Sequence, residues 1–454
     1  MKIKGTMQNK SCKKFFFTNI ILFCLHILFY FPSYADWWHN NSFIMGGRPA
    51  GMGGAYTGIG TGAAGIYYNP GGMGFSPDLQ LSVSTTNYYT STIKQQGYLS
   101  DSSTGFELGD ADLLNGYFGG IFRLDTETPI FLAFAIYNKD YVNIDNVVAS
   151  NSSDGKNKTR YVQKTSSTEN EYAFGGAVRI TPQWSIGASI AFFDIKYSEV
   201  QNTNIVGGPF DDPDNPGNQL YTYEMWNYTS SFFVRGIEGG LGVAYRPNDY
   251  ISFGLSGKYK FIMAQGADST YVDNQVITNS NFVPLGPSST YPYNQYLNKS
   301  TIKEDDRPFG KLPSMLRFGI ALYPLEFQTI TADIAYYSAN QANNPFYQTK
   351  EVFDYFLGSE TIIYEKVALR LGYFTNNWSG DPSVKDQIIN VNFIGYTVGL
   401  SYLNKNSTYG FTWMHQQSKP GAQYQLEESL ASSSKNPSVT WTTNQFAIII
   451  TGEM

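Results

Sequence analysis

Hydrophobic and polar positions alternate with a period of two over many short segments of this chain. In residues 249–265, Ile251 and Phe253 alternate with Ser252 and Gly254, so one set of positions is apolar and the other is small or polar. The same alternation recurs in residues 169–181, 313–324 and 366–377. Such a pattern is typical of β-strands with one apolar and one polar face, and it predicts an all-β protein.

Fourteen segments are predicted as strands: 79–91, 114–124, 129–142, 169–181, 183–200, 230–246, 249–265, 313–324, 327–340, 351–364, 366–377, 389–403, 407–417 and 440–451. Tight joins such as Thr181-Pro182 alternate with long polar connections. The long connections are 92–113, 143–168, 201–229, 266–312, 341–350, 378–388 and 418–439. An even number of strands, with short turns at one end and long loops at the other, is typical of an outer-membrane β-barrel. A soluble sandwich gives no reason for this alternation.

The composition also favours an outer-membrane β-barrel over a soluble β protein. Charged residues make up 15% of the chain, against about 25% in soluble domains, and aromatic residues make up 16%. Many aromatic side chains fall at expected strand ends, where their rings would lie at the level of lipid headgroups, with core packing as the alternative. They are Tyr88, Tyr89, Tyr117, Phe118, Tyr137, Tyr197, Tyr245, Tyr250, Tyr323, Tyr336, Tyr337 and Tyr402.

Residues 1–35 have the pattern of a cleaved secretory signal. Five lysines precede an apolar run from Phe15 to Phe31, and Ser33-Tyr34-Ala35 supplies a small-x-Ala cleavage site. A retained transmembrane helix is the alternative, but the run contains Asn19 and is shorter than the roughly 20 residues of a membrane span. Removal of residues 1–35 is therefore expected.

That removal would change the chemistry of the chain. Cys12, Cys24 and five of the 31 basic residues lie within the segment, which leaves 26 basic against 37 acidic residues and a net charge of −11. A chain without cysteine has no disulfide framework and no zinc–thiolate site. An acidic chain also lacks the basic surface that nucleic acid requires. We therefore expect no cofactor and no nucleic-acid partner.

The segment from residue 46 to residue 74 is rich in glycine and carries one charge. A fourteen-stranded barrel encloses a lumen that the side chains of its wall do not fill, and residues 36–78 are predicted to be the hatch that plugs it. The hatch residues singled out are Gly46, Gly47, Arg48, Gly53, Gly54, Asn69, Pro70 and Gly71, with Asn69-Pro70 locking a turn before the first strand. A phosphate cradle is disfavoured because no G-x-x-x-x-G-K-[ST] motif is present.

The stretch GRPAGMGGAYTGIGTGAAGIYYNPGGMG resembles the hatch of the FadL-type outer-membrane channels for long-chain fatty acids and other hydrophobic compounds. Asn69-Pro70-Gly71 stands where that family has an Asn-Pro-Ala motif. KLPSMLRFGIALYP and LGSETIIYEKVALRLGYF are similar to its later strand pairs. The resemblance implies a transmembrane antiparallel β-barrel of about 14 strands over residues 79–454, located in the outer membrane. The chain departs from the usual pattern by ending in AIIITGEM, where barrels usually end in an aromatic residue, and Phe446 is the nearest one.

The resemblance also implies a route for cargo. A hydrophobic molecule would be captured between the loops after the fifth and seventh strands, 201–229 and 266–312, and would leave sideways through the wall when the hatch moves. The second of these loops carries the apolar residues Phe282, Val283, Leu285, Tyr291 and Tyr293. A lid that packs on itself is the alternative use of such residues.

Four cations are expected to face the lumen, where they could bind a carboxylate: Arg179, Lys258, Arg317 and Arg370. The alternative is that they pair with acidic residues such as Glu238 and Asp333, because buried charges need partners.

Other classes of function have less support. After residue 35 the only histidines are His39 and His415, and no G-x-S-x-G motif is present, so we do not expect an enzyme. The acidic run at 211–214 lacks the bidentate glutamate of a calcium loop, and no metal site is expected. Relatives with this fold also act in protein secretion, and a structural or adhesive surface protein stays open. We expect a monomer in contact with outer-membrane lipids.

Overall fold

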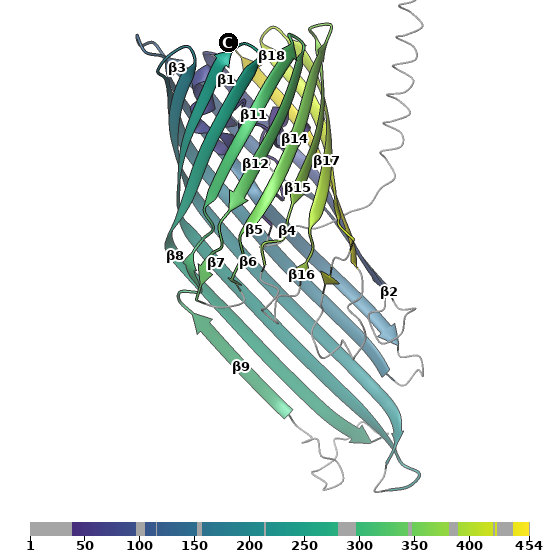
Figure 1. Ribbon diagram of the computed structural model, residues 1–454. Coiled ribbons are helices and arrows are strands. Elements are labelled where there is room, and N and C mark those ends of the chain that lie inside the picture. Colours follow the sequence, from purple (N-terminus) through teal and green to yellow (C-terminus); the bar gives the residue numbers. More distant parts are fainter. Residues whose placement is uncertain are drawn as a thin grey trace, which may run out of the picture.

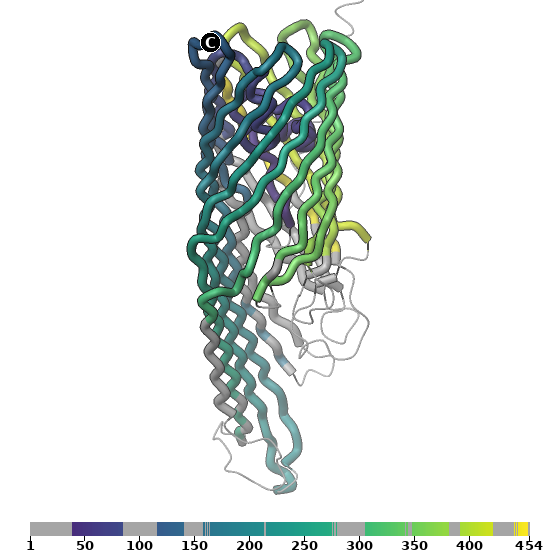
Figure 2. Tube along the Cα trace, turned by 60° about the vertical axis from the view of Figure 1, so that its left-hand side comes forward, coloured from purple at the N-terminus to yellow at the C-terminus, as the bar shows by residue number. Residues whose placement is uncertain are grey.

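The protein is a closed antiparallel β-barrel of fourteen strands (Figures 1 and 2). The computed structural model describes residues 39–96, 105–114, 116–151, 157–212, 215–279, 297–343, 347–380, 389–420, 423–424 and 439–453. The predicted signal segment 1–35 lies outside the described residues. So do the loop residues Phe282, Val283, Leu285, Tyr291 and Tyr293.

The wall runs through β1 (Leu79–Gln96), β3 (Tyr117–Leu124), β4 (Ile130–Asn151), β5 (Asn157–Arg179), β6 (Trp184–Asp211), β7 (Gln219–Asn248), β8 (Ile251–Asn279), β11 (Met315–Leu325), β12 (Gln328–Tyr337), β14 (Val352–Ile363), β15 (Val367–Asn376), β17 (Phe393–Asn404), β18 (Ser407–Ser418) and β20 (Val439–Glu453). Each strand pairs with the next, and β20 pairs with β1 to close the ring.

Six shorter strands complete the sheet structure. β2 (Gly105–Leu114) pairs with β1, and β9 (Leu297–Asp305) pairs with β8. The remaining four form two separate pairs: β10 (Phe309–Lys311) with β13 (Gln341–Ala342), and β16 (Ile389–Asn390) with β19 (Gln423–Tyr424).

The fourteen expected strands are all present, but several are longer than the pattern predicted. Residues 201–211 and 219–229, expected as loop, belong to β6 and β7, and residues 266–279 belong to β8. In Figure 1 these strands project beyond the rest of the barrel at the end opposite the short turns. In these extensions apolar and polar residues do not fall on separate faces, so the alternation ends before the paired backbone does.

The outer face of the wall is apolar. Large side chains such as Phe174, Leu241 and Leu357 are more than half exposed, and every wall strand carries at least one large apolar side chain that is more than a third exposed. Exposure on this scale is typical of a surface that contacts membrane hydrocarbon. Among the residues described, no helix is both long and apolar enough to cross a membrane.

The expected aromatic girdle is only partly correct. Tyr250 and Tyr402 are exposed, but Tyr117, Tyr137 and Tyr337 are at most 7% exposed. These three point into the barrel and join apolar clusters that include the segment before β1. The rings of these three tyrosines pack beside that segment. Packing inside the barrel therefore fixes their position, and not contact with lipid headgroups. The side chains of Tyr88 and Tyr89 lie outside the described part of the chain.

Residues 39–78 lie inside the barrel, near the end with the short turns (Figure 1, purple). They form α2 (Gly47–Gly51), α3 (Gly65–Tyr68) and the 3-10 helix η1 (Pro70–Phe75). Almost every side chain from Gly46 to Gly74 is buried. We call residues 39–78 the hatch segment.

Candidate functional site

Asn69 fixes the turn that carries the hatch segment into β1. Its side-chain oxygen accepts a hydrogen bond from Gly71 N–H at 3.0 Å, while Pro70 occupies the first position of η1. Its amide nitrogen donates to the carbonyls of Thr57 at 3.1 Å and Val243 at 3.0 Å. One asparagine therefore stabilises the turn and ties two parts of the hatch segment to β7, as the Asn-Pro motif predicts for a locked turn.

Glycines let the hatch backbone touch the wall backbone. A Cβ added to Gly53 would lie 2.8 Å from the backbone nitrogen of Tyr373, and one added to Gly71 would lie 2.7 Å from the carbonyl oxygen of Gly242. Gly53 and Gly54 also have positive φ values of 63° and 81°, which favour glycine. Gly46 has a positive φ and Gly47 lies against Ile449.

Wall glycines face the hatch segment from the other side. Seven of the glycines described lie opposite hatch backbone atoms: Gly187, Gly242, Gly254, Gly319, Gly358, Gly372 and Gly399. The alternation placed Gly254 among the small or polar positions of its strand but did not identify its role. A glycine recurs near the middle of several separate wall strands, and this recurrence could have indicated the close contacts with the hatch segment.

Arg48 anchors the start of α2. Its guanidinium makes two hydrogen bonds to Glu360, at 2.6 and 3.1 Å, and Arg370 donates to the same carboxylate at 2.6 Å. Arg370 also donates to Ser401 Oγ at 2.6 Å. Burial alone would lower the pKa of Arg48, but Glu360 outweighs this and holds that pKa above its ordinary value.

Asp333 of β12 receives the backbone of the hatch segment. Its Oδ2 accepts hydrogen bonds from Tyr56 N–H at 2.9 Å and Thr57 N–H at 2.8 Å, and from Arg317 Nε at 3.1 Å. Arg317 in turn donates to the carbonyl of Gly54. Charged wall residues thus satisfy hatch groups that lie away from bulk water.

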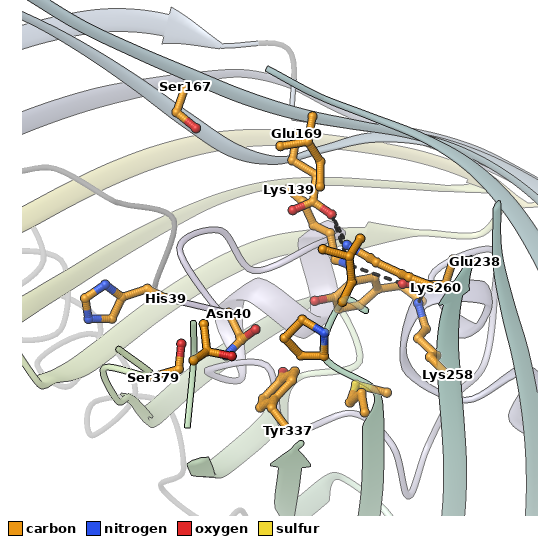
Figure 3. Close-up of a pocket in the computed structure, with 16 residues that line it drawn as sticks. His39, Asn40, Lys139, Ser167, Glu169, Glu238, Lys258, Lys260, Tyr337 and Ser379 are labelled. Atoms are coloured by element: carbon orange, nitrogen blue, oxygen red, sulfur yellow. Dashed lines mark hydrogen bonds and ion pairs between the residues drawn. The ribbon is translucent and has the colours of Figure 1, made fainter. Parts of the chain in front are cut away.

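A cluster of six charges lies in the lumen beside the hatch segment (Figure 3). It contains three lysines and three glutamates from four strands: Lys139, Glu169, Glu171, Glu238, Lys258 and Lys260. The Nζ of Lys139 lies 2.8 Å from Glu171 and 3.5 Å from Glu238, and the Nζ of Lys258 lies 2.6 Å from Glu238. The charges balance, so we call this group the lumen charge cluster.

All members of the lumen charge cluster except Glu171 line a cavity, together with Tyr67, Tyr337 and apolar residues such as Ile195 and Leu312. The cavity measures about 90 Å³, which is room for a few water molecules but less than the roughly 300 Å³ at which pockets for small organic ligands begin. Lys139 and Lys258 also approach the ring of Tyr67, at 5.6 and 4.6 Å from its centre. An organic molecule would therefore enter this space only if the hatch segment or the charged side chains moved.

The four predicted lumen cations do not gather into one site. Lys258 belongs to the lumen charge cluster, Arg317 pairs with Asp333, and Arg370 pairs with Glu360. Arg179 donates to the carbonyl of Gly74 at 2.6 Å and lies over the ring of Phe75. These contacts are of the kind that the pairing alternative anticipated, and binding of a carboxylate at these residues remains a prediction.

Four members of the lumen charge cluster were missed. Glu169 and Glu171 lie on the same side of β5 as Arg179, which was expected to face the lumen, so following alternate positions back along the strand would have found them. Lys260 likewise follows Lys258 by two. Lys139 falls at a β-bulge between Asn138 and Asp140, which alternation alone does not reveal.

The wall has an interruption next to the hatch segment. β3 pairs with β4 up to Tyr117 and Tyr137, and one further hydrogen bond joins Asn138 N–H to Gly116 at 3.2 Å. Beyond it, within the described backbone, β2 pairs with β1 alone and β4 with β5 alone. We call this opening in the ladder the β2–β4 gap.

The histidines considered for catalysis have local partners. His39 lies 2.6 Å from the carbonyl oxygen of Val391, and His415 lies 2.9 Å from the amide oxygen of Asn444. Among the residues described, no group of three or more potential ligands could hold a metal ion.

The fold and the filled lumen define a class of protein, a fourteen-stranded barrel closed around its own hatch segment. The Pseudomonas putida toluene transporter TodX has this fold, with a TM-score of 0.58 and 13% identity over 91% of this chain and 100% of its own. A Pseudomonas aeruginosa FadL homologue gives 0.58 and 12%, over 91% and 99%. The Ralstonia pickettii toluene transporter TbuX gives 0.55 and 13%, over 91% and 99%. No family model and no curated protein matches the sequence. The fold is thus FadL-type, as the hatch resemblance implied.

Proposed function

We propose that this protein is an outer-membrane channel for the passive uptake of long-chain fatty acids or other hydrophobic compounds, acting as a monomer. The β2–β4 gap carries the proposal. An exit through the wall at this break in the ladder would open into membrane hydrocarbon, so it would serve a molecule that dissolves in hydrocarbon and not a sugar or an ion. The toluene transporters that share this fold support the same class of cargo.

Contacts between the hatch segment and the strands beside the β2–β4 gap support a role for this segment in controlling the gap. The ring of Tyr67 packs on Tyr137, the last β4 residue paired with β3, with 5.5 Å between ring centres. A Cβ added to Gly119 of β3 would lie 3.0 Å from the Cβ of Ala63. Movement of α3 away from these strands would join the lumen cavity to the gap. In this proposal the segments 201–229 and 266–312 capture cargo at the opposite end, and cargo then leaves sideways.

A reversible cross-link tests the proposal. The Cβ positions at Ala63 and Gly119 are 3.0 Å apart, closer than the roughly 3.5–4.5 Å of a disulfide, so an Ala63→Cys/Gly119→Cys variant should oxidise once α3 and the end of the Tyr117 side chain shift by about half an ångström, and should then pin the hatch segment beside the gap. No native cysteine after residue 35 would interfere. Uptake of oleate and of toluene should fall to background in the oxidised variant and recover after reduction, because the cross-link holds the hatch shut.

Each single-cysteine variant is the control and should transport under both conditions. Unchanged uptake in the fully oxidised double variant would show that hatch movement beside the gap is not required. Uptake of small sugars at porin-like rates would contradict the hydrophobic cargo and favour an open pore.

A further inference from the structure

The outer face of the wall changes from apolar to polar where β5 to β8 continue into the projecting strands (Figure 1). Along β6 toward the long connections, the exposed Phe192 is followed on the same face by Asp194, Lys196 and Ser198. The neighbouring strand β7 changes at the same height, because its Arg235 pairs in register with Asp194. A boundary between an apolar band and polar residues is the level at which the headgroups of a membrane leaflet lie.

An open hollow of about 390 Å³ lies just beyond this boundary on β5 to β8. Two successive cross-strand rows of the outer face form its floor: Thr168, Lys196, Phe233 and Gly266, and then Ser166, Ser198, Ser231 and Asp268. Met263 is skipped in the β7–β8 register, and a β-bulge of this kind bends the strand beside the hollow. The size of the hollow lies within the range of sites for small organic groups, roughly 300 to 1,000 Å³. We call it the β5–β8 patch.

The ring of Phe233 lies across β8 at this patch. Phe233 pairs in register with Gly266, and a Cβ added to Gly266 would lie 3.0 Å from the ring. Because Gly266 has no side chain, the ring can approach the β8 backbone. Phe233 is still 37% exposed, and the guanidinium of Arg235 borders its ring at 5.4 Å from the ring centre. The patch therefore presents part of an aromatic ring to the outside.

The charges around this ring are balanced. Asp194 accepts a hydrogen bond from Arg235 Nε at 2.8 Å and lies 3.1 Å from Lys196 Nζ. Asp268 adds a second carboxylate in the patch itself. Two cations and two anions leave no net positive charge that would attract a bare carboxylate or phosphate, so the patch suits an uncharged group.

Hydroxyl groups make up much of the remaining floor. Four of the residues in the two rows carry one: Ser166, Thr168, Ser198 and Ser231. A hydroxyl both donates and accepts hydrogen bonds, whereas an acyl chain can do neither. A sugar ring matches this combination, because its C–H groups can pack on the negative face of an aromatic ring while its hydroxyls bond to polar neighbours.

We propose that the β5–β8 patch binds the saccharide headgroup of a glycolipid in the outer leaflet of the membrane, with one sugar ring packed on Phe233. The acyl chains of this lipid lie along the apolar side of the boundary, beside the exposed Phe192 and Phe261. This inference rests on the outer-membrane location in the proposed function, which places the long connections outside, but not on transport or on hatch movement.

Native mass spectrometry of the purified protein in detergent tests the site with two lipids that carry the same oleoyl chains. Digalactosyldioleoylglycerol has an uncharged saccharide head, and dioleoylphosphatidylglycerol has no sugar ring. Phe233→Leu keeps an apolar side chain but removes the ring, so it should weaken binding of the galactolipid by at least about fivefold and leave binding of the phosphatidylglycerol unchanged. Phe233→Trp keeps an aromatic face and should retain galactolipid binding.

Phe261→Leu is the matched control, because Phe261 is an exposed ring on the apolar part of the same face. It should leave binding of both lipids unchanged, and heat-modifiable migration shows that each variant is folded. Galactolipid binding that survives Phe233→Leu at the wild-type level, or that falls equally in Phe261→Leu, overturns the proposal. An equal loss of phosphatidylglycerol in Phe233→Leu also overturns it, because the patch is then a general lipid contact.

A soluble competitor separates a glycolipid from a free sugar. Digalactosylglycerol has the same head without acyl chains, so it should compete at least about tenfold more weakly than the intact galactolipid. Competition as strong as that of the intact lipid would assign the patch to a free sugar and overturn the glycolipid assignment. None of these results bears on oleate uptake through the β2–β4 gap, which the disulfide experiment measures.

Discussion

At the scale of the residue, a few buried charges fix the hatch segment against the wall. Asp333 accepts two hatch N–H groups and the guanidinium of Arg317, and Glu360 joins Arg48 of the hatch segment to Arg370 of β15. The sequence predicted that Arg317 and Arg370 face the lumen, because successive side chains of a strand point to opposite faces. Sequence reasoning named Asp333 as a candidate partner but did not assign it to Arg317, and it missed Glu360, because ion pairs depend on strand register and on the path of the hatch segment, which alternation does not encode.

Removal of the Asp333 carboxylate should loosen the hatch segment. Asp333→Ala leaves Arg317 and the N–H groups of Tyr56 and Thr57 without that acceptor, and breaking a buried pair typically costs about 3–5 kcal/mol. Hydrogen exchange should show that loss in the hatch amides, with the wall strands unchanged. Asp333→Ala/Arg317→Met should recover part of it, because no unpaired cation remains.

Asp194→Ala is the control, since its ion pair with Arg235 is on the exposed outer face and such pairs contribute less than about 1 kcal/mol. Equal losses of hatch protection in the Asp333 and Asp194 variants would contradict the role given to Asp333.

At the scale of the element, close backbone approach replaces side-chain packing between the hatch segment and the wall strands. The glycine-rich sequence predicted such packing, and the alternation predicted the strands that receive it. The hydrophobic alternation did not predict the strand ends that extend beyond the apolar part of the outer wall. Residues 201–211 and 219–229 pair with one another in β6 and β7, yet their apolar and polar positions do not separate cleanly, so those strand ends were missed.

Gly58→Ala tests this contact without backbone strain. The added Cβ would lie 2.7 Å from the backbone nitrogen of Ala321, so the hatch segment should be destabilised by about 1–3 kcal/mol through overpacking. Gly257→Ala is the matched change on a wall strand, where the nearest atom is 3.7 Å away. Hydrogen exchange of residues 46–75 should detect the first change and not the second. Wild-type protection in Gly58→Ala would show that the hatch segment can move aside at no cost.

At the scale of the whole molecule, the strand count, the closure of the ring and the position of the hatch segment followed from the sequence. Even strand number and the alternation of short and long connections leave few other architectures. The interruption of the wall did not follow from it. The β2–β4 gap arises where the β3–β4 pairing ends while β2 stays paired to β1 and β4 to β5, and strand pairing of that kind is set by tertiary contacts.

The central claim is that residues 39–78 close the barrel, and planar-bilayer conductance tests it most directly. The intact protein should show little ion conductance, because the hatch segment fills the lumen. A variant lacking residues 36–65 should remain a folded barrel, as judged by heat-modifiable migration, and should conduct ions steadily. If the folded deletion variant conducts as little as the intact protein, the segment is not the plug, and this account of the barrel is wrong.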